Sequence, residues 1–197
     1  LAYKMRMLGD VGQIEVVQAN VRNAPSVARA VEGAEAVVNL VGVLWESGRQ
    51  KFQTLHVMGA RTVAEQAKAA GVTRFVQISA IGADADSASK YQRTKAEGEA
   101  AVRAVFPGAV VIRPSIVFGA DDKFFNKFGQ MAALFPALPL IGGGETKFQP
   151  VFVADVAQVV AKAVSSPAAE GLTYELGGPA VYSFKHLLEM ILVETGR

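Results

Sequence analysis

The chain has 197 residues, of which 51% are hydrophobic and 19% charged, and its net charge is +2. This composition is typical of one globular domain, and the small net charge excludes nucleic acid as an expected partner. The absence of cysteine excludes a disulfide framework, a thiolate zinc site and a thiol nucleophile. We expect no bound metal, because no carboxylate pair or His/Asp/Glu cluster has convincing ligand spacing. No signal peptide or transmembrane segment is expected, since the longest apolar stretch, Met131–Ile141, is short and interrupted by prolines.

Strands and helices are predicted to alternate through the first half of the chain. The predicted strands are Ile14–Ala19, Ala36–Val41, Arg74–Ser79 and Ala109–Ile112. The predicted helices cover about Pro25–Glu32, the segment after the polar loop Glu46–Gln50 up to Ala70, and Ser89–Phe106. Strands that are almost wholly apolar are buried on both faces, and this alternation indicates a parallel sheet with right-handed crossovers.

The second half is less regular. It predicts helices at Lys123–Leu134, Asp155–Ser165 and Phe184–Glu194, and strands at Phe148–Val153 and Leu172–Leu176. The fold class is therefore α/β, a Rossmann-type doubly wound parallel sheet with a small C-terminal α/β extension. We expect residues 1–197 to form a single domain, in which residues 120–197 contribute a lobe on the substrate or partner side. The first residue is Leu1 rather than Met, and we interpret the chain as a piece of a longer protein.

The first pair of candidate residues is Tyr91 and Lys95, which lie four positions apart at the start of a predicted helix. This spacing places both side chains on one helix face, where an ammonium lowers the pKa of a nearby phenol. Such a tyrosine can exchange a proton with a carbonyl or alcohol, and the lysine can hold a ribose hydroxyl. The alternative is an ordinary surface tyrosine and lysine, because the bare pair arises easily by chance.

The ends of the predicted strands form a second set of candidates. In an open α/β sheet, ligands bind beside the carboxyl ends of the strands. The residues at those ends are Asn20, Val21, Val41, Gly42, Ser79, Pro114, Ser115 and Ile116. Each alone is better explained as an ordinary exit from a strand, and their shared placement favours a cofactor site.

Three other features favour packing or turns. Gly142–Gly144 is preceded by no buried strand, so we interpret it as a flexible turn. His56 and His186 are isolated, and we expect surface or core positions for them. The apolar segment Phe124–Ile141 either packs on the core or forms an exposed surface for a partner protein or a membrane.

Several segments together resemble the extended and atypical short-chain dehydrogenase/reductases. They are AEAVVNLVGVLWE, RFVQISAIGADADS, SKYQRTKAEGE, VIRPSIVFGADDKFFNKF and FQPVFVADVA. The resemblance covers nearly the whole chain and is strongest to the branch that contains the nucleotide-binding accessory subunit of respiratory complex I and its bacterial homologues, often labelled NAD-dependent epimerase/dehydratase. It implies a Rossmann fold and an NADP or NAD cofactor.

The resemblance also implies roles for single residues. It places Asn20 and Val21 beside adenine, where many members have Asp instead of Asn20, and Val41 and Gly42 beside the adenine-side ribose and the pyrophosphate. It places Ser79 on the nicotinamide side and the segment Pro114 to Ile116, with Ser115, along the nicotinamide amide. Tyr91 and Lys95 match the family's catalytic Tyr/Lys pair.

Two departures from the family pattern matter. Active members usually carry a hydroxyl two positions after the position of Ser79, whereas this chain has Ile81, which leaves catalysis in doubt. The Gly-rich turn of the first strand–helix unit, and the strand that selects NAD or NADP, do not occur in the sequence. Because such a turn supplies much of the phosphate binding, we expect a full-length parent to bind the cofactor and this chain alone to bind it weakly or not at all.

Three functions follow from these residues and the resemblance. The leading one is a non-catalytic or weakly catalytic nucleotide-binding subunit of respiratory complex I, docked through Phe124–Ile141. The second is a free-standing NAD(P)-dependent oxidoreductase or epimerase that uses Tyr91 as acid and base. The third is a redox sensor that binds the cofactor without turnover. The expected location is the cytoplasmic side of a bacterial inner membrane, peripherally bound, or the cytoplasm.

Overall fold

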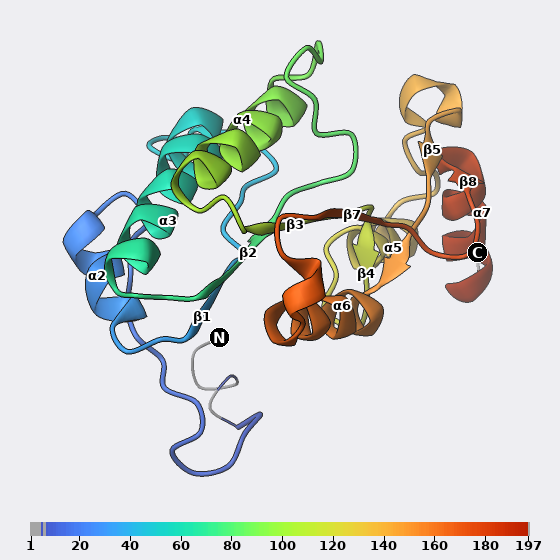
Figure 1. The fold of residues 1–197 in the computed structure, drawn as a ribbon. Coiled ribbons are helices and arrows are strands. Elements are labelled where there is room, and N and C mark those ends of the chain that lie inside the picture. Colours follow the sequence, from blue (N-terminus) through green and yellow to red (C-terminus); the bar gives the residue numbers. More distant parts are fainter. Residues whose placement is uncertain (1–4, 6, 197) are drawn as a thin grey trace.

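The computed structural model, which describes residue 5 and residues 7–196, is organised around a four-stranded parallel sheet (Figure 1). The strand order is β1–β2–β3–β7, and the strands are parallel at each pairing. Their bounds are Ala36–Asn39 for β1, Arg74–Ile78 for β2, Val110–Pro114 for β3 and Thr173–Leu176 for β7. The parallel sheet expected from the alternation of strands and helices is confirmed.

Helices cover both faces of this sheet. On one face pack α2 (Ala24–Val31), α3 (Ala60–Ala69) and α4 (Lys90–Val105), around a core that includes Phe75. On the other face packs α6 (Val153–Ser165), around a core that includes Val76. Neighbouring residues of β2 point to opposite faces because side chains alternate along a strand. The doubly wound arrangement is therefore confirmed.

A third core lies away from the main sheet and consists largely of aromatic rings. It joins α5 (Phe125–Leu134), α7 (Phe184–Glu194) and β5 (Lys147–Phe148), and β5 pairs antiparallel with β8 (Tyr182–Ser183). Two further short strands, β4 (Val117–Phe118) and β6 (Val151–Phe152), pair with each other in parallel. In Figure 1 the group α5, β5 and α7 lies on the other side of the view from α2, α3 and α4.

The expected strand Ile14–Ala19 is wrong. Residues 14–20 form no strand and are mostly exposed. A β-branched run becomes a strand only where a neighbour supplies backbone hydrogen bonds, and within the described residues this segment pairs with nothing.

The expected strand Phe148–Val153 is wrong as a single element. It divides into β5 and β6, which belong to different small sheets, and α6 follows directly from Val153. Pro150 lies between the two strands and has no N–H to donate to a continuous ladder.

The long helix that ends before Gly71 forms as expected, but its first turns are wider than α. Gln53–Gly59 is a π-helix, η1, and the chain continues as α3 without interruption. π-Helical turns are rare and frequently lie at functional sites. The turn expected at Gly142–Gly144 is confirmed by positive φ angles at all three residues, within the short 3₁₀ element η2 (Ile141–Gly144). A second 3₁₀ turn, η3 (Pro167–Ala169), follows α6.

Candidate functional site

The carboxyl ends of β1, β2 and β3 meet at one edge of the parallel sheet, and α4 lies against this edge. Lys95 of α4 reaches the end of β2, where its Nζ donates a 2.9 Å hydrogen bond to the carbonyl of Ile78. Gly42 follows β1, and a Cβ built on it would lie 3.8 Å from Lys95 Nζ. The structure therefore brings together Gly42, Lys95 and the end of β2, as the sequence predicted.

Lys95 is a buried cation, with 7% of its surface exposed. Burial lowers its pKa from 10.5 to about 8, and the nearby charge of Glu99 partly opposes this shift. Lys95 thus remains mainly protonated at neutral pH. An ammonium group has three N–H donors, and one hydrogen bond to Ile78 leaves two for a ligand.

Tyr91 is half-buried beside Lys95 on the same helix. Its ring packs edge-on against Phe52 and His56, with centroid distances of 5.6 and 5.4 Å. Burial raises the pKa of the Tyr91 phenol, so the lowered pKa that we expected from Lys95 is wrong. The Lys95 ammonium instead donates to the backbone of β2.

A cleft of about 1240 Å³ opens at the same sheet edge. Four of the predicted site residues line it, namely Tyr91, Pro114, Ser115 and Ile116. Ile81 also lines the cleft and is 40% exposed, so the position at which active relatives would present a hydroxyl presents a hydrocarbon chain. The Tyr91 hydroxyl makes no hydrogen bond with the described residues.

Ser79 follows β2 and is buried, with 5% of its surface exposed. Its backbone N–H donates to the Ile112 carbonyl at 2.7 Å, whereas its Oγ has no hydrogen-bond partner in the described residues. Buried hydroxyls normally find partners. Ser79 is not among the residues that line the cleft, so its hydroxyl does not replace the donor missing at Ile81.

The two residues predicted to contact adenine lie elsewhere. Asn20 borders a separate hollow of about 450 Å³ near the start of α2, where its Oδ1 accepts from the N–H of Arg22 at 3.0 Å. Val21 packs beside Gly59, on which a built Cβ would lie 2.9 Å from Val21 Cγ2. Val41 is 37% exposed, and its N–H donates to Asn39 Oδ1. The structure does not join Asn20 and Val21 to the cleft beside Tyr91.

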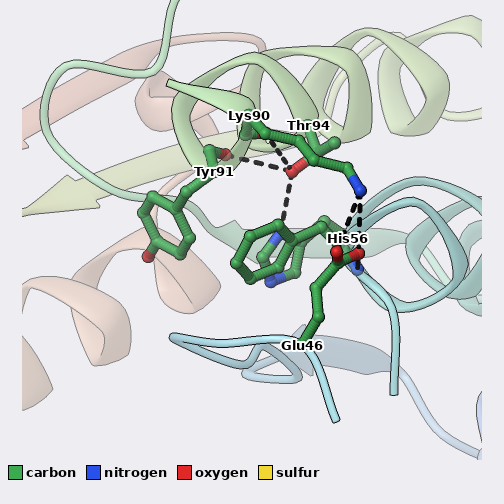
Figure 2. Close-up of polar contacts among 6 residues, drawn as sticks. Glu46, His56, Lys90, Tyr91 and Thr94 are labelled. Carbon is green, nitrogen blue, oxygen red and sulfur yellow. Dashed lines mark hydrogen bonds and ion pairs between the residues drawn. The ribbon is translucent and has the colours of Figure 1, made fainter. Parts of the chain in front are cut away.

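His56 is the residue whose role sequence reasoning missed. It lies in η1 (Figure 2) and is 3% exposed, and its ring stacks on that of Phe52. Its Nε2 lies 3.1 Å from the N–H of Val43, and its Nδ1 lies 3.1 Å from Thr94 Oγ1. Of the two positions expected for His56, surface or core, the structure shows the core, and both ring nitrogens also connect elements of the site.

The contacts of the His56 ring fit either tautomer. Thr94 Oγ1 also lies within hydrogen-bond distance of the carbonyls of Lys90 and Tyr91, and Nε2 lies 3.1 Å from both the nitrogen and the carbonyl oxygen of Val43. Either tautomer therefore makes one hydrogen bond at each ring nitrogen. Burial and the charge of Lys95 lower the pKa of His56 from 6.5 to about 4, which keeps the ring neutral at physiological pH.

A second connection joins the same elements nearer the surface. Glu46 forms an ion pair with Lys90 at 2.9 Å, and its Oε1 accepts the N–H of Phe52 (Figure 2). These two hydrogen bonds lower the pKa of Glu46. These two connections hold together the segment after β1, the start of η1 and the start of α4. The Tyr91 hydroxyl points away from Glu46 and Lys90 in Figure 2.

The predicted docking segment Phe124–Ile141 divides into two parts. Phe124, Phe128, Ala132 and Leu138 pack into the third core. Four large apolar residues at its end are 46–78% exposed, namely Leu134, Phe135, Leu140 and Ile141. Core packing is therefore the right interpretation for the first set of residues. The second set forms an exposed apolar surface.

His186 lies on the surface of α7, where its ring stacks on Tyr182. No group of three His, Asp or Glu residues in the described part of the chain could hold a metal ion. None of the helices within residues 7–196 is both long and apolar enough to cross a bilayer.

A protein family described as NAD(P)H-binding matches residues 2–117, which is more than half of the chain. The chain is 40% identical over 194 residues to NADH dehydrogenase (ubiquinone) 1 alpha subcomplex subunit 9, mitochondrial, of Mus musculus, covering 98% of this chain and 51% of that protein. The protein of the same name in Arabidopsis thaliana is 35% identical over 95% of this chain and 47% of its own length. The resemblance stated from the sequence is confirmed.

A solved structure of MoeE5 in complex with UDP-glucuronic acid and NAD superposes with a TM-score of 0.82. It covers 95% of this chain and 71% of that one, at 17% sequence identity, and this likeness concerns the fold alone. The chain spans about half the length of the curated relatives that it matches.

The relatives overturn the expected location. We expected the cytoplasmic side of a bacterial inner membrane, or the cytoplasm, but the proteins that match over nearly the whole chain are named as mitochondrial. The signals for a bacterial location were indirect, because surface charge and hydropathy do not distinguish these compartments.

Proposed function

This chain belongs to the NAD(P)H-binding family, and we propose that it forms part of a subunit of respiratory complex I that holds a dinucleotide without turning it over. The observation that carries the proposal is that the same sheet edge has a buried lysine, Lys95, and an apolar residue, Ile81, at the position of the family's hydroxyl. Lys95 offers buried donors suited to a ribose hydroxyl, while Ile81 gives the cleft no donor where a substrate carbonyl would need one. The group that would bind the ribose is thus present, whereas the hydroxyl that would polarise a substrate carbonyl is absent.

The residues at the sheet edge fit a dinucleotide on two physical grounds. Gly42 has no side chain between the backbone and the Lys95 ammonium, which permits close approach of a ligand. The buried Ser79 hydroxyl lacks a partner in the described residues, as is common where a ligand completes a polar site. When bound, a nicotinamide ring supplies hydride chemistry. Lys95 would hold its ribose, Pro114, Ser115 and Ile116 would lie along its amide, and Asn20, Val21, Val41 and Gly42 would serve the adenine half.

Association with complex I rests on the names of the relatives and on the exposed apolar residues at the end of α5. Leu134, Phe135, Leu140 and Ile141 are large side chains with substantial exposure, and such groups mark interaction surfaces. We propose that this end of Phe124–Ile141 faces other subunits of the complex. The relatives named as complex I subunits are about twice the length of this chain, so the proposal concerns the full-length protein.

Capture of the full-length protein from detergent-solubilised respiratory membranes tests both parts of the proposal. We expect complex I subunits to co-purify with the protein. On denaturation, the captured protein should release about one molecule of NADP(H) or NAD(H) per molecule of protein. The released nucleotide identifies the cofactor. Capture without complex I subunits, or without nucleotide, would contradict the corresponding part.

A second candidate is an NAD(P)-dependent oxidoreductase or epimerase in which Tyr91 acts as acid and base. The free Tyr91 hydroxyl in the cleft favours it. Tyr91→Phe removes only this hydroxyl and distinguishes the two functions. If a reductase activity is measured in the purified protein and falls about a hundredfold or more in the variant, Tyr91 is a proton donor. Unchanged complex I activity in Tyr91→Phe supports the non-catalytic subunit.

A further inference from the structure

We propose that the cleft beside Tyr91 binds one molecule of an anionic amphiphile, a compound with a long apolar chain and a phosphate or carboxylate head. The inference rests on the proposed function in one respect, since it names the ligand class of the cleft beside the dinucleotide. It is carried by the chemistry of the cleft walls, whose apolar residues come from both lobes and whose charged residues are three lysines and one aspartate.

The walls of the cleft are mainly hydrocarbon and aromatic. The sheet-edge side contributes Ile81, Ile116 and Val117, and the segment after β1 contributes Leu44 and Trp45. The other lobe contributes Phe124, Phe128, Phe148 and Val181. Leu44, Trp45 and Val181 are 59–68% exposed, which is a costly arrangement for large apolar groups unless a ligand covers them.

Three neutral polar side chains of the cleft are hydrogen-bonded within the protein. Gln149 donates to the Gly178 carbonyl at 2.6 Å, and Asn126 donates to the carbonyls of Ala120 and Asp122. Gln92 accepts from the Ser87 hydroxyl. A sugar ring presents a hydroxyl on almost every carbon and needs free donors and acceptors around it. The side chains of Tyr91, Ser115, Gln130 and Thr146 have no hydrogen bond with the described residues, so it is the extent of the apolar walls that favours an alkyl chain.

The charges of the cleft favour an anion. Lys123, Lys127 and Lys147 line it, and none of their side chains forms an ion pair or hydrogen bond with the described residues. Asp122 is the one carboxylate among the described lining residues, and its Oδ1 is occupied by the N–H groups of Phe124 and Phe125 at the start of α5. All three lysines come from the α5 and β5 side, so the head would lie there and the chain would extend toward Ile81 and Tyr91.

Calorimetric titration of decyl phosphate into the full-length protein tests the inference. We expect saturable binding of one molecule, and binding of decyltrimethylammonium at least tenfold weaker, because that probe keeps the chain and reverses the charge. Inorganic phosphate and UDP-glucose are expected not to compete. Quenching of Trp45 fluorescence on binding, lost in Trp45→Phe, would place the probe in the cleft.

Matched variants locate the two ends of the ligand. Lys127→Gln and Lys147→Gln are each expected to weaken decyl phosphate binding about three- to tenfold, while Lys185→Gln, on the surface of α7, changes it less than twofold. Val181→Asp is expected to weaken binding more than tenfold, and Val193→Asp, exposed outside the cleft, to leave it unchanged.

Equal affinity for the two alkyl probes, tighter binding of UDP-glucose, or binding only to phosphatidylglycerol vesicles would each overturn the inference. The last result would indicate a membrane surface rather than a cleft ligand. Absence of decyl phosphate binding in protein that still carries its nucleotide would refute the amphiphile and leave the proposed function standing. Binding of decyl phosphate by protein that carries no nucleotide would support the amphiphile and contradict the proposed function.

Discussion

His56 Nδ1 lies 3.1 Å from Thr94 Oγ1, and this hydrogen bond connects the π-helical turn η1 to the segment of α4 between Tyr91 and Lys95. Its other nitrogen lies 3.1 Å from both the backbone nitrogen and the carbonyl oxygen of Val43 in the loop after β1. One neutral side chain therefore sets the position of Gly42 relative to Lys95. The close packing of Gly98 against His56, where a built Cβ would lie 2.1 Å from the His56 carbonyl oxygen, fixes the same geometry.

Separate variants of His56 test the contribution of each nitrogen. His56→Asn keeps a donor near the Nδ1 position and loses the bond to Val43, and His56→Gln does the opposite. We expect each to lower the free energy of unfolding by about 1–2 kcal/mol, because each leaves one buried polar group without its partner. Thr94→Val should cost a similar amount, whereas Thr62→Val, at a half-buried position of α3 without a contact to His56, should cost less. Equal effects of the two threonine variants in urea denaturation would contradict the proposed role.

Stability should fall in mild acid because of His56. Its pKa is lowered from 6.5 to about 4 on folding, so between these values the unfolded chain binds more protons than the folded one. The stabilisation is complete above pH 6.5 and is lost as the pH falls toward 4. Between pH 7 and pH 5 we expect His56 to account for about 2 kcal/mol of lost stability. Urea denaturation of the wild type and of His56→Asn at both pH values should show a smaller loss in the variant.

The buried Lys95 should lower the free energy of unfolding at neutral pH and should be required for nucleotide binding. Because burial lowers its pKa to about 8, the folded state holds the ammonium less favourably than the unfolded state does at neutral pH. We expect Lys95→Met to raise the free energy of unfolding by about 1–3 kcal/mol at pH 7 and to abolish nucleotide retention. The wild type should gain stability relative to the variant as pH rises from 8 toward 10.5. A variant that is less stable at pH 7 and still retains nucleotide would refute this role.

Arg113 should stabilise the fold rather than bind a ligand. Its guanidinium makes two hydrogen bonds to the buried Glu99, at 2.7 and 2.9 Å, and one to Glu175 at 3.2 Å. These partners raise the pKa of Arg113. Arg113→Met leaves the Glu99 carboxylate buried without its partner, which typically costs about 3–5 kcal/mol. The double variant Arg113→Met, Glu99→Met should recover a large part of that loss in the same denaturation assay.

The 197-residue chain by itself should bind NADPH at least tenfold more weakly than the full-length protein. Within residues 7–196 no glycine-rich turn joins a buried strand to a helix N-terminus, and such turns supply much of the phosphate binding. Fluorescence titration of NADPH with both proteins measures the difference. Equal micromolar affinities would show that the described residues suffice for binding.

Most of the fold was accessible from the sequence because its signals are local. Apolar runs such as Arg74–Ile78 and the helix Phe184–Glu194 appear close to their predicted bounds, since burial on both faces and capping residues mark them in any context. The candidate pair Tyr91 and Lys95 was proposed from its spacing together with its position at the start of a helix after a buried strand, and its role stays a prediction. Ile14–Ala19 was predicted wrongly because β-propensity does not reveal whether a partner strand is present.

The sequence by itself determined the alternation of elements, the family and the identity of the groups at the sheet edge. Only the tertiary structure decided what those groups experience. Burial raises the pKa of Tyr91 and lowers that of Lys95, and the π-helical turn brings His56 against Val43 and Thr94. These effects arise from desolvation and from hydrogen-bond geometry at contacts between residues far apart in the chain. The spacing of residues along the sequence reveals neither the desolvation nor the geometry.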